Sequence, residues 1–250
     1  MTVSVGSLGA TSSSATSTTL AHTTITTPVA VGDVVVVVTG RGAGASATGV
    51  ADSAGNTYTA LAASQASGSI NIRVFVAIAT AAMAIGGTIT ATFGGSSGTK
   101  FVVAGVASGL PSATNEGTAQ VTGSGNPMSQ TIPAVGPDVS VQFSFLGIDG
   151  AGVITTDADL TSLITRSQSS LQVRLAYRIL STPTATANDP SNATAAQPFL
   201  LGYVNFSTPN VAGGGTGGML SVAAEHLLAH NPQARLTMFG QELNDESYAI

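Results

Sequence analysis

The sequence contains no cysteine and no tryptophan, and charged residues make up only 8% of its 250 positions. A typical soluble domain has about 25% charged residues. Without cysteine, disulfides and thiolate metal sites are excluded. Basic residues number seven against twelve acidic ones, and Lys100 is the single lysine. A nucleic-acid-binding protein needs clustered Lys and Arg, so we expect no nucleic-acid partner.

Long apolar runs and a targeting signal are also missing. The longest β-branched run, residues 34–38, is far shorter than the roughly 20 residues that span a bilayer. The first residues lack the basic and continuous apolar regions of a signal peptide. We therefore expect no membrane insertion and no export signal.

Glycine, alanine, serine, threonine and valine fill most of the chain instead. With 43% apolar residues and a net charge of −5, the composition is that of a folded protein rather than a disordered one. The valine run at 34–38 follows Pro28, Gly32 and Asp33 and predicts a buried strand, because β-branched side chains pack well on a pleated sheet. A polar turn at 52–56 then leads into another strand.

Strand-like segments recur at close spacing and are bounded by Gly, Ser, Asn or Pro. They cover residues 23–27, 33–39, 57–62, 70–79, 88–93 and 101–107. Residues 70–78 alternate with period two, which indicates one strongly buried face. This pattern is typical of an all-β sandwich.

The second half of the chain echoes the first. Asp138 follows Asp33, and Asp157 follows Asp52, at the same spacing of 105 residues. Three pairs of segments resemble each other: 27–36 with 132–141, 70–76 with 171–177, and 101–106 with 199–204. We infer a duplication and predict two tandem antiparallel sandwiches, Ig-like or jelly-roll-like, with a C-terminal helix and extended arm.

The composition changes near the end of the chain. A Gly-rich hinge is followed by a helix pattern at 219–230 and then by a segment rich in charged and apolar residues. The predicted parts are an N-terminal arm (1–22), two sandwiches (23–112 and 113–210), the hinge (211–218) and the tail (219–250). An amphipathic tail must bury its apolar face against something. The candidate interface residues are Leu220, Leu227, Leu228, Leu236, Met238, Phe239, Leu243 and Tyr248.

Metal sites have few candidate ligands. The turn at 52–56, with Asp149, Asp157 and Asp159, offers oxygen atoms of the kind that calcium uses. Each loop shows only one or two ligands, so ordinary turn chemistry is favoured. His226 and His230 have the spacing of a two-histidine zinc pair, but no third ligand accompanies them. We expect no metal and no cofactor.

The sequence also shows no set of residues typical of an enzyme active site. The letters GxSxG occur once, at residues 94–98, in a Gly/Ser-rich turn between two strand-like segments and not at a strand-to-helix elbow, and His22 lies in a threonine-rich segment. A glycosidase needs two carboxylates across a cleft. The available Asp residues lie in turns without aromatic platforms. We expect no catalytic residues and no enzyme activity.

One resemblance covers residues 23–110 well and 129–206 more loosely. Its pattern is Pro28, Gly32-Asp33, the valine run, the turn sequence Asp-Ser-Ala-Gly-Asn-Thr-Tyr at 52–58 and the strand at 72–75. This order resembles β-sandwich modules in structural proteins of tailed bacteriophages, notably those of actinobacterial hosts. The second half lacks the Gly-Asn-Thr-Tyr portion. Similar modules also occur in bacterial surface proteins.

The resemblance implies a non-enzymatic virion protein, either a minor tail component or a capsid-surface decoration, assembled in the host cytoplasm. Its expected partners are capsid or tail subunits and further copies of itself. The alternative is a carbohydrate-binding or adhesin module that recognises a glycan of the bacterial cell envelope. Its candidate aromatic residues are Tyr58, Phe75, Tyr177 and Tyr203, for which a place in the core is favoured.

Overall fold

The computed structural model describes residues 2–207 except 23–24, 43, 62–64, 97, 111–112, 135–138, 151, 183 and 193–195. Within this part the chain is all-β, and every strand ladder is antiparallel. The predicted fold class is confirmed in this respect. The hinge, the helix at 219–230 and all eight candidate interface residues lie outside the described residues.

The first half of the chain forms a large sheet and a small one. The large N-terminal sheet has the order β1 (Ser4–Ser13), β9 (Lys100–Ser108), β3 (Val34–Gly42), β7 (Ile70–Ile78) and β5 (Thr59–Ala60), with β6 (Gln65–Ser67) also paired to β7. The small sheet is β2 (Thr19–His22), β8 (Ile89–Phe93) and β4 (Ala47–Asp52). The valine run forms the start of β3 and is buried on both faces, as the sequence predicts.

The second half repeats this plan. Its large C-terminal sheet has the order β10 (Thr114–Gly123), β18 (Phe199–Ser207), β12 (Ser140–Asp149), β15 (Leu171–Leu180) and β14 (Thr161–Gln168). Two short ladders cover its outer face: β11 (Gln130–Ile132) with β16 (Thr186–Asn188), and β13 (Ile154–Thr155) with β17 (Ser191–Asn192). In each large sheet, the first strand of that half of the chain lies at one edge, and the last strand of that half lies next to it. Two strands from the middle of the half follow. This shared strand order supports the duplication.

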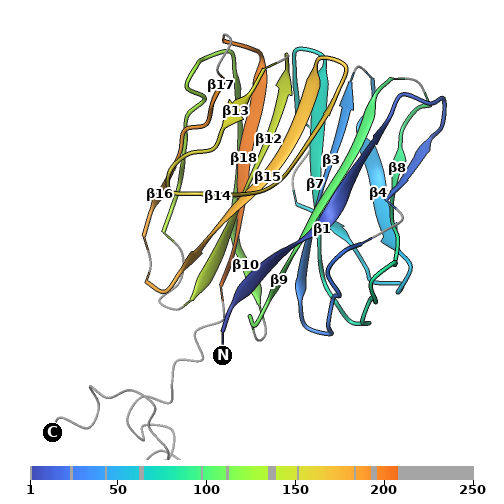
Figure 1. Ribbon diagram of the computed structural model, residues 1–250, viewed down its shortest axis with the longest axis vertical. Coiled ribbons are helices and arrows are strands. Elements are labelled where there is room, and N and C mark those ends of the chain that lie inside the picture. Colours follow the sequence, from blue (N-terminus) through green and yellow to red (C-terminus); the bar gives the residue numbers. More distant parts are fainter. Residues whose placement is uncertain are drawn as a thin grey trace, which may run out of the picture. The chain divides into compact units, whose positions relative to one another are not determined.

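The two large sheets pack face to face and share one core. Val34, Val36 and Val38 face this inter-sheet core, which also contains Phe143 and Phe206 from the other half. Val35 and Val37 point the other way, into a second core beneath the small sheet. Figure 1 shows the resulting order of layers, from β13, β16 and β17 through the two large sheets to β4 and β8.

Glycines allow the large sheets to approach closely. A Cβ added to Gly40 would lie 2.7 Å from Val173, and one on Gly147 would lie 2.7 Å from Ile72. These contacts join the two halves, because each glycine meets a side chain of the other half. Any larger residue would push the sheets apart, since interiors are packed without spare volume.

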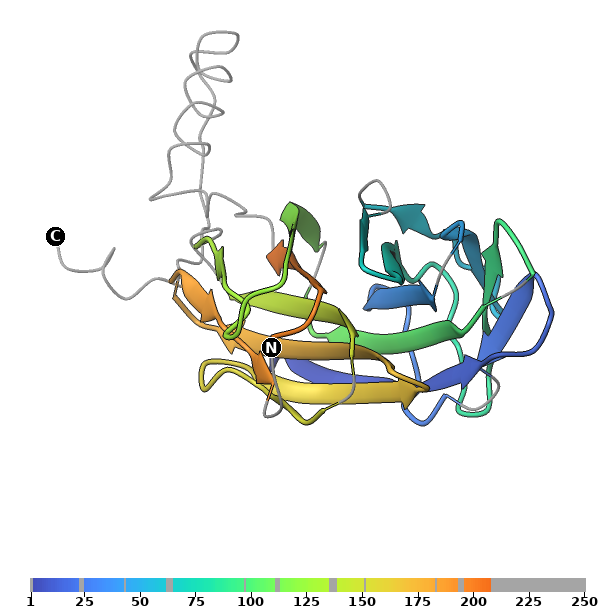
Figure 2. The same cartoon turned by 90° about the horizontal axis from the view of Figure 1, so that it is seen from above.

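Residues 1–22 do not form the predicted arm. Ser4–Ser13 form β1, which pairs with β9 along its length, and Leu8 is fully buried. The edge strand also borders β14: Arg166 Nε donates to Ser12 Oγ at 2.8 Å, and Gln168 Nε2 donates to Ser14 Oγ at 2.8 Å. Figure 2 shows the dark blue β1 beside the yellow β14. In the sequence, Val3, Val5 and Leu8 indicate only a short edge strand. The full length of β1 is not predicted, because its other residues are small and their burial comes from neighbours distant in sequence.

Residues 1–209 form one compact unit. The predicted boundary between residues 112 and 113 falls in the link between β9 and β10. Leu110 and Ala113, on either side of it, are themselves part of the inter-sheet core. The two halves therefore correspond to the two copies of the repeat but depend on each other for burial.

Candidate functional site

The carboxylate of Asp52 accepts four hydrogen bonds at the turn formed by residues 52–56. Its Oδ1 accepts from the backbone N–H groups of Ala54 (2.9 Å) and Asn56 (3.1 Å). Its Oδ2 accepts from Asn56 Nδ2 (2.9 Å) and from the hydroxyl of Tyr58 (2.9 Å). Because one carboxylate binds four donors, residues 52–56 form a hydrogen-bonded turn, in agreement with the interpretation favoured from the sequence.

Asn56 fastens this turn to the connection between β7 and β8. It is 5% exposed, and its Oδ1 accepts from the backbone N–H groups of Thr80 (2.8 Å) and Ala81 (2.9 Å). Its Nδ2 also donates to the carbonyl of Ala81 at 3.1 Å. The Gly-Asn pair of the sequence motif therefore has a structural role.

Tyr58 provides a pH-dependent test of this turn. Burial, and then the neighbouring Asp52 carboxylate and its hydrogen bond, raise the pKa of Tyr58 well above its ordinary value. The folded state therefore holds this proton more tightly than the unfolded state, so its stabilising effect is complete below the unfolded pKa of about 10 and is lost above it. We expect the free energy of unfolding to fall above this pH by up to about 1.4 kcal/mol per pH unit.

Urea unfolding at a series of alkaline pH values measures this slope. Tyr58→Phe should flatten the slope and cost about 1 kcal/mol at neutral pH through the lost hydrogen bond. Asp52→Asn should lower the pKa of Tyr58 in the folded protein, as followed by tyrosinate absorbance. Superimposable alkaline stability curves for Tyr58→Phe and the wild type would contradict the assignment.

The acidic residues that the sequence nominates in the second half each have a structural hydrogen-bond or ion-pair partner. Asp149 Oδ2 accepts from the backbone N–H of Ser69 at 2.6 Å, and Asp159 forms an ion pair with Arg178 at 3.2 Å. Asp157 accepts from the backbone N–H groups of Asp159 (2.8 Å) and Asp189 (3.1 Å). Within the described residues, no group of three or more His, Cys, Asp or Glu side chains could hold a metal ion.

The remaining candidate residues have structural partners, lie in or against the cores, or fall outside the described residues. His22 is 8% exposed, and its Nε2 lies 3.1 Å from the carbonyl oxygen of Leu8. His226 and His230 lie outside the described residues. Of the aromatic candidates, Phe75 and Tyr203 are buried, while Tyr58 and Tyr177 are partly buried against the cores. The prediction of core positions is confirmed for Phe75 and Tyr203.

A buried cation is the feature that sequence reasoning missed. Lys100 is 1% exposed, and its ammonium donates to the carbonyls of Ala15 (3.1 Å), Ser96 (2.7 Å) and Gly98 (3.1 Å). Desolvation, and then the nearby Arg41, lower the pKa of Lys100. These hydrogen bonds link the β1–β2 connection and the β8–β9 connection to the first residue of β9. No sequence signal marks them, because all three acceptors are backbone atoms.

Exposed apolar side chains gather at one end of the sandwich. Val31, Ile78, Ile85 and Ile179, which we call the apolar end, are 66%, 46%, 66% and 39% exposed. Ile78 pairs with Val34 at the start of β3 in the N-terminal sheet. Leu180, next to Ile179, pairs with Ser140 at the start of β12 in the C-terminal sheet, and Ser140 also pairs with Ser207. Ser207, the last described residue, lies at this end as well. Val153, also exposed, follows β12 at the opposite end.

Within the described part of the chain, no helix is long and apolar enough to cross a bilayer. Comparison with known proteins gives no match to a family model, to a curated protein or to a solved structure.

Proposed function

We propose that the protein is a non-enzymatic structural protein of a bacteriophage virion, a minor tail or capsid-surface decoration protein that acts through subunit contacts. The observation that carries this proposal is the apolar end. Exposed apolar residues are ordinary when they are scattered, but a gathering on one face marks an interaction surface. Four of the five large exposed apolar residues lie at this end.

The position of Ser207 adds to this argument. Ser207, the last described residue, lies at the apolar end, and the sequence predicts an amphipathic stretch at 219–250. Both features present apolar side chains that need a partner. We expect this partner to be another copy of the chain or a neighbouring capsid or tail subunit.

The virion setting rests on the sequence pattern of residues 28–75, which resembles the modules of tailed bacteriophages. The structural role agrees with the site geometry, in which the carboxylates of Asp52, Asp149 and Asp157 serve turns and links between segments. The glycan-binding alternative has less support: Phe75 and Tyr203 lie in cores, and Tyr58 donates its hydroxyl to Asp52.

The oligomeric state of the full chain tests the proposal. Native mass measurement should show a discrete homo-oligomer, and deletion of residues 219–250 should reduce it while leaving the unfolding midpoint of the sandwich unchanged. Ile85→Asp at the apolar end should weaken assembly by about tenfold or more, because a charge would be buried at the contact. Immunogold labelling of particles that contain the protein would then place it on the tail or the capsid.

Val153→Asp is the matched control, since this residue is equally exposed but lies at the opposite end. It should leave assembly unchanged. Incorporation of the chain lacking residues 219–250 into particles at the level of the full chain would contradict the proposed role of that segment. A full chain that stays monomeric and is absent from particles would contradict the function as a whole.

A further inference from the structure

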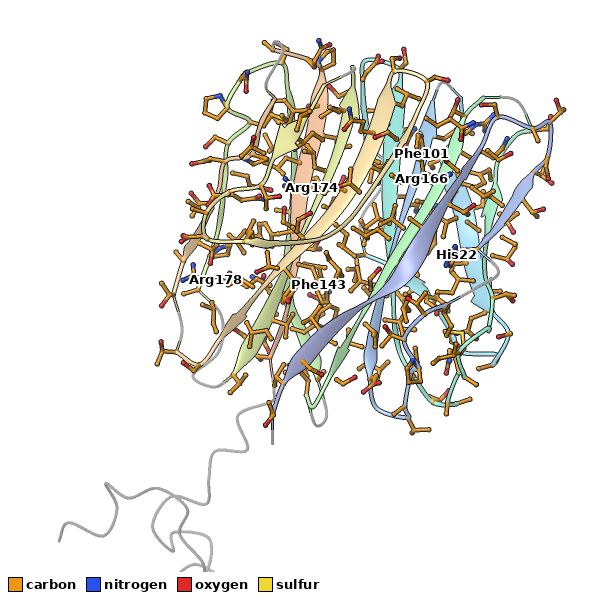
Figure 3. The ribbon with its side chains drawn as sticks, viewed as in Figure 1. His22, Phe101, Phe143, Arg166, Arg174 and Arg178 are labelled. Atoms are coloured by element: carbon orange, nitrogen blue, oxygen red, sulfur yellow. The ribbon has the colours of Figure 1, made fainter. Side chains whose placement is uncertain are left out.

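The outer face of the C-terminal sheet carries a buried polar layer. Strand alternation sends Phe143 and Leu175 into the inter-sheet core and Gln142, Ser144 and Arg174 to the opposite side. Phe143 and Arg174 are labelled in Figure 3. The short ladders β11–β16 and β13–β17 cover this face. The corresponding space in the first half, beneath the small sheet, is filled with apolar side chains. The two copies of the repeat therefore differ in what they bury.

Arg174 is the most deeply buried charge in this layer. The residue is 1% exposed, and its Nη1 donates to Thr156 Oγ1 at 3.3 Å. Its Nε and Nη2 have no hydrogen-bond partner among the described residues. These two nitrogens form one edge of the guanidinium, and their N–H bonds point in parallel. This edge is the fork that binds two oxygen atoms of a carboxylate or phosphate.

The counterpart of Arg174 in the first half, Arg73, has an aromatic neighbour that Arg174 lacks. The matching segments 70–76 and 171–177 align Arg73 with Arg174 and Phe75 with Ala176. The Arg73 guanidinium lies over the ring of Phe75 at 5.4 Å, and its Nη1 donates to the carbonyl of Ala47 at 3.0 Å. Its Nε has no hydrogen-bond partner among the described residues, but its Nη2, unlike that of Arg174, is not a buried atom without one. Ala176 offers no ring, so the buried guanidinium of Arg174 lacks the equivalent cover.

Among the described residues, Asp157 is the acidic group that acts on Arg174, and Asn188 of the same layer carries a donor without a partner. Asn188 is fully buried, and its Oδ1 accepts from Ser144 at 2.9 Å, whereas its Nδ2 is without a partner in the described chain. Both oxygens of Asp157 already accept backbone N–H groups. Burial lowers the pKa of Arg174 to about 10 against the opposing effect of Asp157, so the guanidinium stays charged at neutral pH.

A buried cation with unused donors is costly unless an acceptor meets it. We propose that the fork of Arg174 binds a small oxyanion with carboxylate-like geometry. The near-complete burial of Arg174 restricts the ligand to a small ion. This site is independent of the apolar end and of the proposed assembly.

Sodium formate is the probe, with sodium chloride at equal ionic strength as the reference. In the full-length ¹⁵N-labelled protein, the Nε–H resonance of Arg174 should shift downfield with saturable dependence on formate. The thermal midpoint should rise over the same concentrations, since a ligand that binds only the folded state stabilises it. A parallel titration with inorganic phosphate shows whether the site accepts a tetrahedral oxyanion as well.

Arg174→Met should abolish both responses, whereas Arg73→Met, the matched change in the first half, should leave them intact. Ala176→Phe restores the ring that the first half has at Phe75 and should weaken formate binding by about tenfold or more, which keeps the test informative if Arg174→Met fails to fold. Responses to formate and phosphate no greater than to chloride in the wild-type protein would overturn the proposal. A formate response that survives Ala176→Phe and Arg174→Met unchanged would do the same.

Discussion

A fragment that ends at residue 112 is expected to fail to fold as a monomer, although it contains one complete copy of the repeat. Without the second half, it would expose the inner face of the N-terminal sheet. That face consists of Val34, Val36, Val38, Ile70, Ile72, Val74, Phe101 and Val103. Each such side chain gains about 1.5–3 kcal/mol on burial. Their sum of about 12–24 kcal/mol is comparable to or larger than the net stability of about 5–15 kcal/mol that a domain has.

Size-exclusion chromatography and amide NMR spectra of the fragment measure this effect. Residues 1–209 serve as the control and should fold, because they form the compact unit. Co-expression of 1–112 with 113–209 should restore a soluble complex, since each fragment covers the inner face of the other. A monomeric 1–112 fragment with dispersed amide signals and cooperative unfolding would show instead that the two sandwiches are independent domains.

Phe143→Ala is expected to destabilise the whole sandwich by about 3–5 kcal/mol, the usual cost of truncating a buried aromatic side chain. Phe143 is fully buried in the inter-sheet core. Its ring meets that of Phe206 edge to face, with 6.5 Å between centroids and 78° between planes. Truncation removes this pair and leaves a cavity between the halves. Guanidinium unfolding of the full chain gives the change directly.

The Phe143→Ala change should also destabilise both halves of the chain together. Because the inter-sheet core is shared, amide signals from both halves should lose intensity at the same lowered midpoint. Val153→Ala, at a residue that is 70% exposed, should change stability by less than about 0.5 kcal/mol. Unfolding of the second half alone, with the first half unchanged, would contradict the shared core.

Part of the fold could be read from local patterns. The valine run at 34–38 and the alternation at 70–78 both lie in central strands of the N-terminal sheet, β3 and β7. The turn at 52–56 was also predictable, because Asp and Asn organise turns through hydrogen bonds with their own neighbours. These features depend on residues close in sequence.

The duplication was visible in the sequence, but its register was not. The matching of 101–106 with 199–204 aligns Phe101 with Phe199. In the structure, Phe101 lies in the inter-sheet core, whereas Phe199 packs on the outer face with Met128 and Leu146. The two segments are therefore matched one residue out of step, and a shift of one residue moves a side chain to the other face of a sheet. Low-complexity runs of small and apolar residues permit such a shift without a visible mismatch.

The sequence by itself determined that this protein is all-β, that its strands come in two similar sets, and that Asp52 belongs to a turn. Tertiary structure alone decided which faces meet. It placed β1 at the edge of a sheet, buried Lys100 among backbone carbonyls and joined the two copies across one core. The physical reason is that strand propensity and turn chemistry are local, whereas the small residues of β1 are buried by β9, about a hundred positions away. The burial of Lys100 likewise needs the carbonyl of Ala15, 85 positions away, in addition to two nearby carbonyls, and no local pattern specifies that partner.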